Sequence, residues 1–330
     1  MRLTSLSLFS SILACSILSA YTEMPDETGL IINNVTVVDA VSPIRAERSV
    51  VIRDDKIFAV NPALKGQAAN TSNVIDGSGQ FLIPGLWDMH VHLTYDDAFT
   101  ESMPKLFLAH GITSVRDTGG LMEKMEPVIK KMRAPEAISP RVYFSGPLLD
   151  GKFVVYDGDL VPEIGTENST ISMAKKKVTE LNDAGVDFIK IYEMVSPEIF
   201  NALSEAASIY DLPIAAHVPL SMRASIAGPA VDSMEHLRNV ELDCAFNSAQ
   251  LHEERLAILN SHENGAGLTL RSSLHTAQRL PAINNFDEQK CNQTIDNLKS
   301  TIQVPTLRLN AFSMYPGYER EDWDNVLKIV

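Results

Sequence analysis

The stretch FLIPGLWDMHVHL, residues 81–93, ends an apolar run with two histidines one residue apart. Side chains alternate between the two faces of a β-strand, so Asp88, His90 and His92 are expected to share one face. Two imidazoles at that spacing can reach one metal ion from the same side of a strand end. Structural histidines satisfied by hydrogen bonds would give the same pattern, so the pair alone does not decide between the two.

After this stretch, strand-like and helix-like segments alternate along the chain. The expected strands are 81–88, 111–117, 141–146, 186–193, 212–217, 231–236 and 303–310, and the expected helices include 99–109, 120–133, 170–184 and 196–210. Ser196-Pro197 is a typical helix start and Gly185 a typical helix end. Repeated βα units predict an α/β fold with a parallel sheet, either doubly wound or closed into a (β/α)8 TIM-type barrel. No glycine fingerprint of a dinucleotide or phosphate site follows a strand, which disfavours the doubly wound alternative.

Ahead of the βα units, residues 23–80 have a different pattern. The segments GLIINNVTVVDA, RSVVIRDDKIFAV and NVIDGSGQ are β-branched or alternating, and Gly, Asn, Asp or Pro residues bound them. They predict a small N-terminal β domain, followed by a larger domain over residues 81–330.

The first 22 residues are typical of an export signal. Arg2 precedes an apolar run that ends at Leu18, shorter than the ~20 apolar residues of a membrane-spanning helix. The segment ILAC, ending at Cys15, resembles a bacterial lipobox, whose cysteine is lipidated after cleavage. The alternative is plain cleavage near Ala20. We therefore expect an exported protein, either periplasmic, anchored to a membrane through a lipidated Cys15, or secreted.

The amino-acid composition limits the kinds of partner that this chain is expected to bind. Of the 330 residues 45% are hydrophobic and 21% charged, the formal net charge is −14, and the longest basic run is KKK at 175–177. This excess of acidic residues argues against a nucleic-acid partner. Cys244 and Cys291 could form a disulfide in an oxidising compartment, but two unpaired, partly buried thiols are slightly favoured. A cysteine-based zinc site is not supported.

Three further strand ends change the interpretation of the histidine pair. His217 ends LPIAAH and His236 ends VDSMEH, and barrel enzymes place their catalytic residues at the carboxyl ends of strands. In VDFIKIYE, Lys190 occupies the middle of an apolar strand, where a lysine is costly unless it is paired or neutralised. A salt bridge would explain this lysine. The functional alternative is an amine that reacts with CO2, giving a carbamate that can bridge two cations.

Taken together, PGLWDMHVHL, FIKIY, AAHVP and MEHL resemble the metal-dependent amidohydrolase superfamily, in particular its exported imidazolonepropionase-like and prolidase-like members. The resemblance covers about residues 28–330, including VPTL at 304–307. It implies a distorted (β/α)8 barrel, a small N-terminal β-sandwich of the urease-like composite kind, and a binuclear centre that usually holds zinc.

The same resemblance implies a ligand set. His90 and His92 would bind the first metal, His217 and His236 the second, and carboxylated Lys190 would bridge them. A hydroxide shared by the two metals would attack the substrate carbonyl. Neutral imidazoles suit zinc.

The chain departs from the family at one ligand. The family has an aspartate at the end of the eighth strand, which serves as catalytic base, and no such residue follows QVPTLRLN. Asp322 and Asp324 lie in the polar segment YEREDWDN, which is typical of a helix start. We therefore expect a chain incomplete at its C-terminus, with the last barrel strand and the catalytic aspartate beyond residue 330 and low activity in the 330-residue chain.

Several other residues have weaker claims. Arg116 and Asp117 end the second strand, where either could orient substrate, although a buried ion pair is favoured. Tyr192 lies on the same face as Lys190 and could contact a substrate oxygen or serve only in packing. The segment 147–168, with Tyr156, is expected to be a loop over the site. Four more histidines are expected to be surface or structural residues: His110, His252, His262 and His275.

The leading hypothesis is a metal-dependent hydrolase of carbon–nitrogen bonds in small amides, cyclic amides or dipeptides. An ester or lactone hydrolase with the same site is the first alternative. A non-catalytic, amidohydrolase-like scaffold that binds partners is the second. Besides the small-molecule substrate, a second copy of the chain remains open as a partner.

Overall fold

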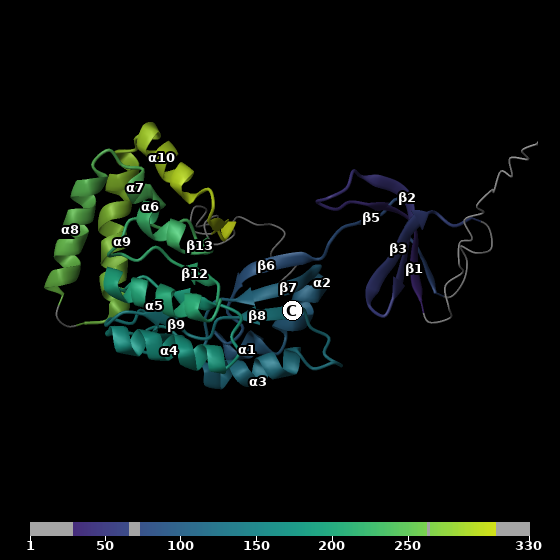
Figure 1. Ribbon diagram of the computed structural model, residues 1–330, viewed down its shortest axis with the longest axis horizontal. Helices are drawn as coiled ribbons and strands as arrows, with labels where there is room; N and C mark the ends of the chain where they lie inside the picture. The colour runs from purple at the N-terminus through teal and green to yellow at the C-terminus, as the bar shows by residue number, and fades with distance from the viewer. Residues whose placement is uncertain (1–28, 66–72, 263–264, 308–330) are drawn as a thin grey trace, which may run out of the picture. The chain divides into compact units, whose positions relative to one another are not determined.

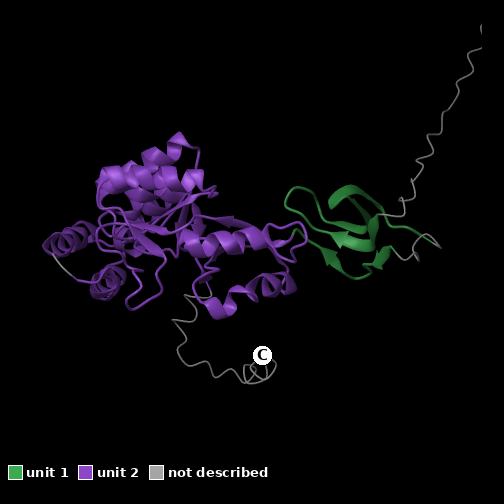
Figure 2. Cartoon of the chain, turned by 90° about the horizontal axis from the view of Figure 1, so that it is seen from below, with its two compact units in different colours: residues 1–84 green, residues 85–330 purple. Residues whose placement is uncertain are grey.

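The computed structural model describes residues 29–65, 73–262 and 265–307 (Figure 1). The chain divides into two compact units, residues 1–84 and 85–330 (Figure 2). The expected export signal, with Cys15, lies outside the described residues, as do Asp322 and Asp324. Within the described ranges, no helix is both long enough and apolar enough to cross a membrane.

The first unit is a five-stranded sheet. Burial alternates along the central strand, where Val35 and Val37 pack with Val50 in the small core. Its described residues form one sheet, with the order β3-β2-β1-β4 and β5 also pairing with β1, where a sandwich was expected. The strands are β1 (Leu30–Val37), β2 (Arg45–Arg53), β3 (Lys56–Pro62), β4 (Val74–Asp76) and β5 (Phe81–Leu82).

The second unit is built on parallel strands in two sheets, which confirms the expected parallel α/β architecture. The smaller sheet has the order β6-β7-β8, from β6 (Leu86–Val91), β7 (Ile112–Asp117) and β8 (Arg141–Phe144). The larger has the order β10-β9-β11-β12-β13-β14, from β9 (Leu148–Asp150), β10 (Gly165–Glu167), β11 (Ile189–Ile191), β12 (Ile214–Ala216), β13 (Ser233–Glu235) and β14 (Ile302–Val304). The expected strand 81–88 is divided, because Pro84 separates β5 in the first unit from β6 in the second.

A short segment of chain, residues 145–147, connects β8 of the smaller parallel sheet to β9 of the larger one. The strand expected over 141–146 ends at Phe144, and Gly146 has a φ of +73°, a conformation that favours glycine. The chain resumes as β9, which pairs with β11. Strands of the second unit therefore follow chain order from β6 to β8 and from β9 through β11 to β14. No closed sheet is present among the described residues, so the expected closed barrel is not confirmed.

Helices cover the strands at the expected places. The one expected over 99–109 is two, α1 (Asp97–Thr100) and α2 (Met103–Ala109), and the others are α3 (Met122–Met132), α4 (Ile171–Asp183), α5 (Pro197–Ile209) and α6 (Ala224–Ala227). The Ser196 hydroxyl accepts a hydrogen bond from the Ile199 amide and caps α5, as its sequence predicts. Ile199, Phe200 and Leu203 then bury one face of α5 in the main core.

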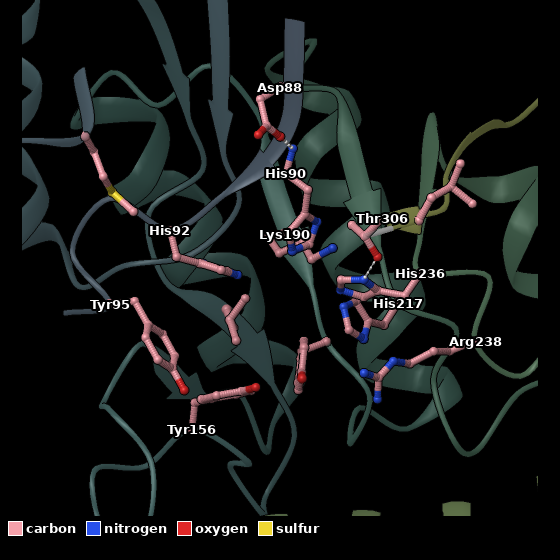
Figure 3. A pocket seen from close by; sticks show the side chains of 14 residues that line it. Asp88, His90, His92, Tyr95, Tyr156, Lys190, His217, His236, Arg238 and Thr306 are labelled. Atoms are coloured by element: carbon pink, nitrogen blue, oxygen red, sulfur yellow. Dashed lines mark hydrogen bonds between the residues drawn. The ribbon is translucent and has the colours of Figure 1, made fainter. Parts of the chain in front are cut away.

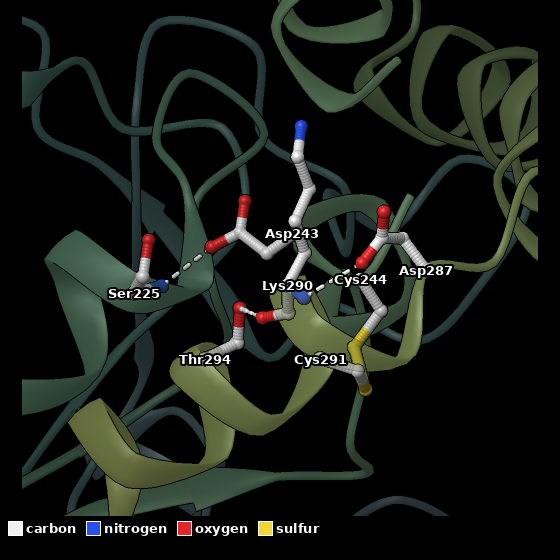
Figure 4. Close-up of a disulfide and its surroundings, with 7 residues drawn as sticks. All are labelled: Ser225, Asp243, Cys244, Asp287, Lys290, Cys291 and Thr294. Carbon is white, nitrogen blue, oxygen red and sulfur yellow. Dashed lines mark hydrogen bonds between the residues drawn. A yellow bond between two sulfur atoms is a disulfide. The ribbon is translucent and has the colours of Figure 1, made fainter. Parts of the chain in front are cut away.

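In the described residues between β13 and β14 there are four helices. They are α7 (Val240–Asp243), α8 (Ser248–Ser261), α9 (Gly267–Asn284) and α10 (Glu288–Leu298). Cys244 and Cys291 form a disulfide between the end of α7 and the first turns of α10 (Figure 4), so the slight preference for free thiols was wrong. The backbone amide of Asp287 also donates to the carbonyl of Cys244, at 2.8 Å. The fold brings together two cysteines 47 residues apart, which spacing alone could not show.

Candidate metal centre

A cavity of about 720 Å³ opens in the second unit, at the carboxyl ends of its parallel strands (Figure 3). Parallel α/β folds place their sites at this end. Every side chain predicted to bind metal lines it. The lining residues are Asp88, His90, His92, Tyr95, Met103, Leu148, Tyr156, Lys190, Tyr192, His217, His236, Arg238, Thr306 and Leu307.

The first histidine pair lies at the end of β6. His90 Nδ1 is 2.7 Å from Glu235 Oε2, and His92 Nδ1 is 3.0 Å from the carbonyl oxygen of Gly119. The two ring centroids are 5.1 Å apart. The buried Asp117 carboxylate accepts a hydrogen bond from the Leu93 amide at 2.6 Å, which fixes the chain directly after His92.

The second histidine pair follows β12 and β13. His217 Nδ1 is 2.6 Å from Glu193 Oε1, and His236 Nδ1 is 2.6 Å from Thr306 Oγ1. Their ring centroids are 4.7 Å apart. His236 has a φ of +64°, an uncommon conformation for a residue with a side chain. A strained histidine at the end of an apolar strand is a frequent feature of functional sites.

All four histidines therefore have an oxygen atom against Nδ1. A neutral imidazole that donates from Nδ1 has its lone pair on Nε2, the form that binds metals. Burial lowers the pKa of His92 to about 3 and that of His236 to about 2, so both are neutral near pH 7. Imidazoles with Nδ1 engaged in this way can bind a metal ion through Nε2.

Lys190 lies in the middle of β11 and is fully buried, with an exposed fraction of 0%. Its Nζ has no hydrogen-bond partner among the described residues, and its nearest carboxylate oxygen, Glu235 Oε1, is 3.8 Å away. Burial lowers the pKa of this amine to about 8, although Glu235 opposes the shift. The neutral amine, the form that reacts with CO2, is therefore accessible near neutral pH.

The sequence reasoning missed two buried glutamates. Glu193 and Glu235 have exposed fractions of 0% and 1%. Glu235 accepts hydrogen bonds from His90 and, at 2.5 Å, from Arg116. Burial opposes ionisation of Glu235, but Lys190, His90 and Arg116 outweigh it and lower its pKa to about 2. The signal that identified Lys190, a charge within an apolar strand, was also present in KIYE and SMEH.

The remaining predicted residues divide between the cavity and its surroundings. Tyr192 lines the cavity, as does Tyr156 from the segment 147–168, which carries β9 and β10 as well as loop. Arg116 is not among the lining residues, because its guanidinium binds Glu235, Ser233 and the Met89 carbonyl. Asp117 accepts its hydrogen bonds from backbone amides and does not pair with Arg116.

The other four histidines lie apart from the cavity lining. His275 is structural, because its Nε2 is 2.7 Å from Glu193 Oε2. His110 is exposed and bonds to the Leu106 carbonyl.

The donor set fits a pair of metal ions only if Lys190 contributes. In residues 29–65, 73–262 and 265–307, no three His, Cys, Asp or Glu side chains form a ready-made ligand group. Each predicted metal has two histidines, whereas catalytic zinc usually has three protein ligands. A carbamate on Lys190 would add an oxygen ligand to both pairs, and the unpartnered amine among the four imidazoles is consistent with that role.

Comparison with known proteins finds a family match over part of this chain. Residues 81–228 match the family model described as "Amidohydrolase family". A segment of 86 residues is 33% identical to adenine deaminase from Desulforamulus reducens and covers 26% of this chain. The match spans only 14% of the length of that relative.

Solved structures show the likeness of the fold over a longer range. A Xaa-Pro dipeptidase with methionine bound in its active site superposes with a TM-score of 0.57 at 16% identity, over 84% of this chain and 79% of that one. Molinate hydrolase superposes with a TM-score of 0.56 at 16% identity, over 84% and 72%. The solved structures show the same fold over most of this chain, and residues 81–228 match the amidohydrolase family.

Proposed function

We propose that this protein is a metal-dependent hydrolase of carbon–nitrogen bonds in small amides, cyclic amides or dipeptides. One observation carries the proposal: four histidines with Nδ1 engaged surround a buried lysine without a hydrogen-bond partner, on one cavity. The family domain supports the reaction class. The names of its relatives, a dipeptidase and a deaminase, also describe enzymes that break carbon–nitrogen bonds.

Two divalent cations, with zinc the best match to neutral imidazoles, would occupy the cavity. His90 and His92 would hold one, His217 and His236 the other, and carboxylated Lys190 would supply oxygen ligands to both. When bound, such ions supply Lewis acidity, which activates water and polarises the scissile carbonyl.

Residues of the cavity wall support a proposal for the class of substrate. Tyr95, Tyr156 and Tyr192 form a row of rings whose successive centroids are 6.3 and 5.7 Å apart. Arg238 also lines the cavity, and no described carboxylate pairs with it at ion-pair distance. A compact substrate with an apolar portion and a free carboxylate, such as a dipeptide, fits an aromatic row beside an unpaired cation.

Zinc content and turnover test the proposal together. We expect the full-length protein, including any chain that follows residue 330, to bind about two zinc ions per chain when it is loaded with zinc and bicarbonate. We expect it to hydrolyse dipeptides or N-acyl amino acids. Esters, lactones and adenine belong in the same assay. Faster cleavage of an ester or lactone than of the matching amide would favour the first alternative. Absence of zinc and of turnover would overturn the proposal in favour of the scaffold.

The role of Lys190 gives a sharper prediction. We expect Lys190→Ala to lower turnover at least about 100-fold and to lower zinc content, because both metals lose their shared oxygen ligand. Acetate or propionate added to this variant should restore part of both quantities by occupying the vacated space. Lys177→Ala, which removes a lysine paired with Glu180 on α4, is the matched control and should behave as wild type. Wild-type turnover in Lys190→Ala would contradict this role.

We further propose that the protein works outside the cytoplasm. The Cys244–Cys291 disulfide supports this location, because disulfides persist in oxidising compartments. Cell fractionation tests it, with the protein expected in a periplasmic, membrane-associated or secreted fraction, and recovery in the cytoplasm would contradict it.

A further inference from the structure

Helix α9 delivers two side chains to the buried carboxylate beside His217. We propose that Glu193, clamped by Arg271 and His275, is a positioning residue that presents His217 to a metal ion. The inference rests on the proposed function for its metal, and it adds a role for the helical segment between β13 and β14.

Glu193 is held by three donors. His217 Nδ1 lies 2.6 Å and Arg271 Nη2 3.0 Å from Glu193 Oε1, and His275 Nε2 lies 2.7 Å from Oε2. The carboxylate is fully buried, and Arg271 is 8% exposed. A buried carboxylate is costly unless it is paired and hydrogen-bonded on its oxygens. Here both oxygens accept hydrogen bonds, which hold the carboxylate against His217.

The consequence for His217 is a fixed tautomer. A carboxylate at Nδ1 requires a proton on that nitrogen, which leaves the Nε2 lone pair free for a metal. Thr306 and the Gly119 carbonyl act on His236 and His92 through neutral oxygens. Each predicted pair thus contains one histidine held by a carboxylate, His217 by Glu193 and His90 by Glu235.

The two residues that hold Glu193, Arg271 and His275, both come from α9, and this helix also contacts the cavity wall. Arg271 and His275 are four residues apart and share one face of α9, while Glu193 follows β11. The Arg271 guanidinium also lies over the Tyr192 ring, 5.9 Å from its centroid, and Tyr192 lines the cavity. One helix face therefore contacts both the support of a predicted ligand and the cavity wall.

Replacing the carboxylate by an amide tests the positioning role. We expect Glu193→Gln to lower zinc affinity at one of two sites by about 10- to 100-fold, as loss of such a partner does elsewhere. Zinc titration against a chromophoric chelator measures this. In the metal-free protein, 15N NMR of labelled histidines should show His217 as the Nδ1–H tautomer in wild type and as a mixture in Glu193→Gln. Glu241→Gln is the control, because Glu241 forms an ion pair with the exposed Arg279 outside the cavity, and this variant should keep the zinc affinity of wild type.

A second set of variants keeps the test valid if Glu193→Gln does not fold. His275→Gln can still donate a hydrogen bond to Glu193 and should keep zinc affinity within a few-fold of wild type. His275→Leu cannot donate one and should lose affinity, as should Arg271→Leu. Arg279→Leu changes an exposed arginine on the same helix and should have no effect.

The outcomes separate the two proposals. If wild type binds no zinc, the proposed function fails, while the NMR tautomer still decides whether Glu193 positions His217. If wild type binds zinc and all Glu193, Arg271 and His275 variants retain its affinity and tautomer, the positioning role is overturned. Equal losses in His275→Gln and His275→Leu would also overturn it, because the hydrogen bond would then be irrelevant.

Discussion

At the scale of single residues, Asp150 shows how burial sets a pH dependence. Its carboxylate ends β9 and accepts hydrogen bonds from the backbone amides of Met194, Val155 and Gly151. Burial raises the pKa of Asp150 to about 7, well above the usual range of an aspartate, and Glu193 acts in the same direction. These bonds tie the segment after β9 to the end of β11.

The raised pKa predicts that Asp150 stabilises the fold more at low pH. The folded state holds the proton more tightly, so this contribution is present below pH 4 and is lost as the pH rises to about 7. The loss amounts to roughly 4 kcal/mol. The variant Asp150→Asn has no titratable side chain at this position. The free energy of unfolding of wild type should therefore exceed that of Asp150→Asn by a smaller amount at pH 7 than at pH 4. Urea unfolding at several pH values measures this difference, and a difference that stays constant across this range would contradict the prediction.

The residue scale also shows where sequence reasoning succeeded and where it stopped. Lys190 was identified because a charge within an apolar strand needs an explanation. Glu193 and Glu235 carry the same signal, but their partners come from 24 to 145 residues away in sequence. No spacing rule connects a carboxylate to a histidine at such separations.

At the scale of elements, Gly146 lies in the short link between β8 of the smaller parallel sheet and β9 of the larger one. Its φ is +73°, and a Cβ there would lie 2.9 Å from Leu181 Cδ2 and 3.0 Å from Met122 Sδ. We expect Gly146→Ala to lower the free energy of unfolding by about 2–4 kcal/mol, from left-handed strain plus crowding. Gly185 has a similar φ of +77° with nothing within 4 Å, so Gly185→Ala should cost only about 1–2 kcal/mol. Equal costs in denaturant unfolding would show that crowding at Gly146 does not matter.

The disulfide gives a second prediction for an element, the helical segment between β13 and β14. Closing a loop of this length contributes about 4 kcal/mol in the chain-entropy model. We expect the double variant Cys244→Ala/Cys291→Ala to unfold at lower temperature than wild type. A reducing agent should lower the unfolding temperature of wild type and leave that of the double variant unchanged. An effect of reductant on the double variant would show that it acts elsewhere.

At the scale of the whole molecule, a metal that binds only the native state must stabilise it. Free zinc at about 100 times its Kd should add about 2.7 kcal/mol per site. We therefore expect zinc to raise the unfolding temperature and a chelator to reverse the change. The shift should shrink in His90→Ala and in His217→Ala but persist in His110→Ala, which alters an exposed histidine. A full shift in His90→Ala would remove that residue from the predicted ligands.

The sequence by itself predicted the main alternation of strands and helices after residue 81, the helix start at Ser196 and the helix end at Gly185, and the set of strand-end residues that meets at one cavity. It could do so because periodicity, capping and strand ends are local properties. Only the tertiary structure decided which sheet each strand joins, where Gly146 breaks a strand, that Cys244 pairs with Cys291, and that α9 reaches Glu193. Those features depend on contacts between distant segments, where burial and hydrogen bonding select the partner and sequence separation carries no information.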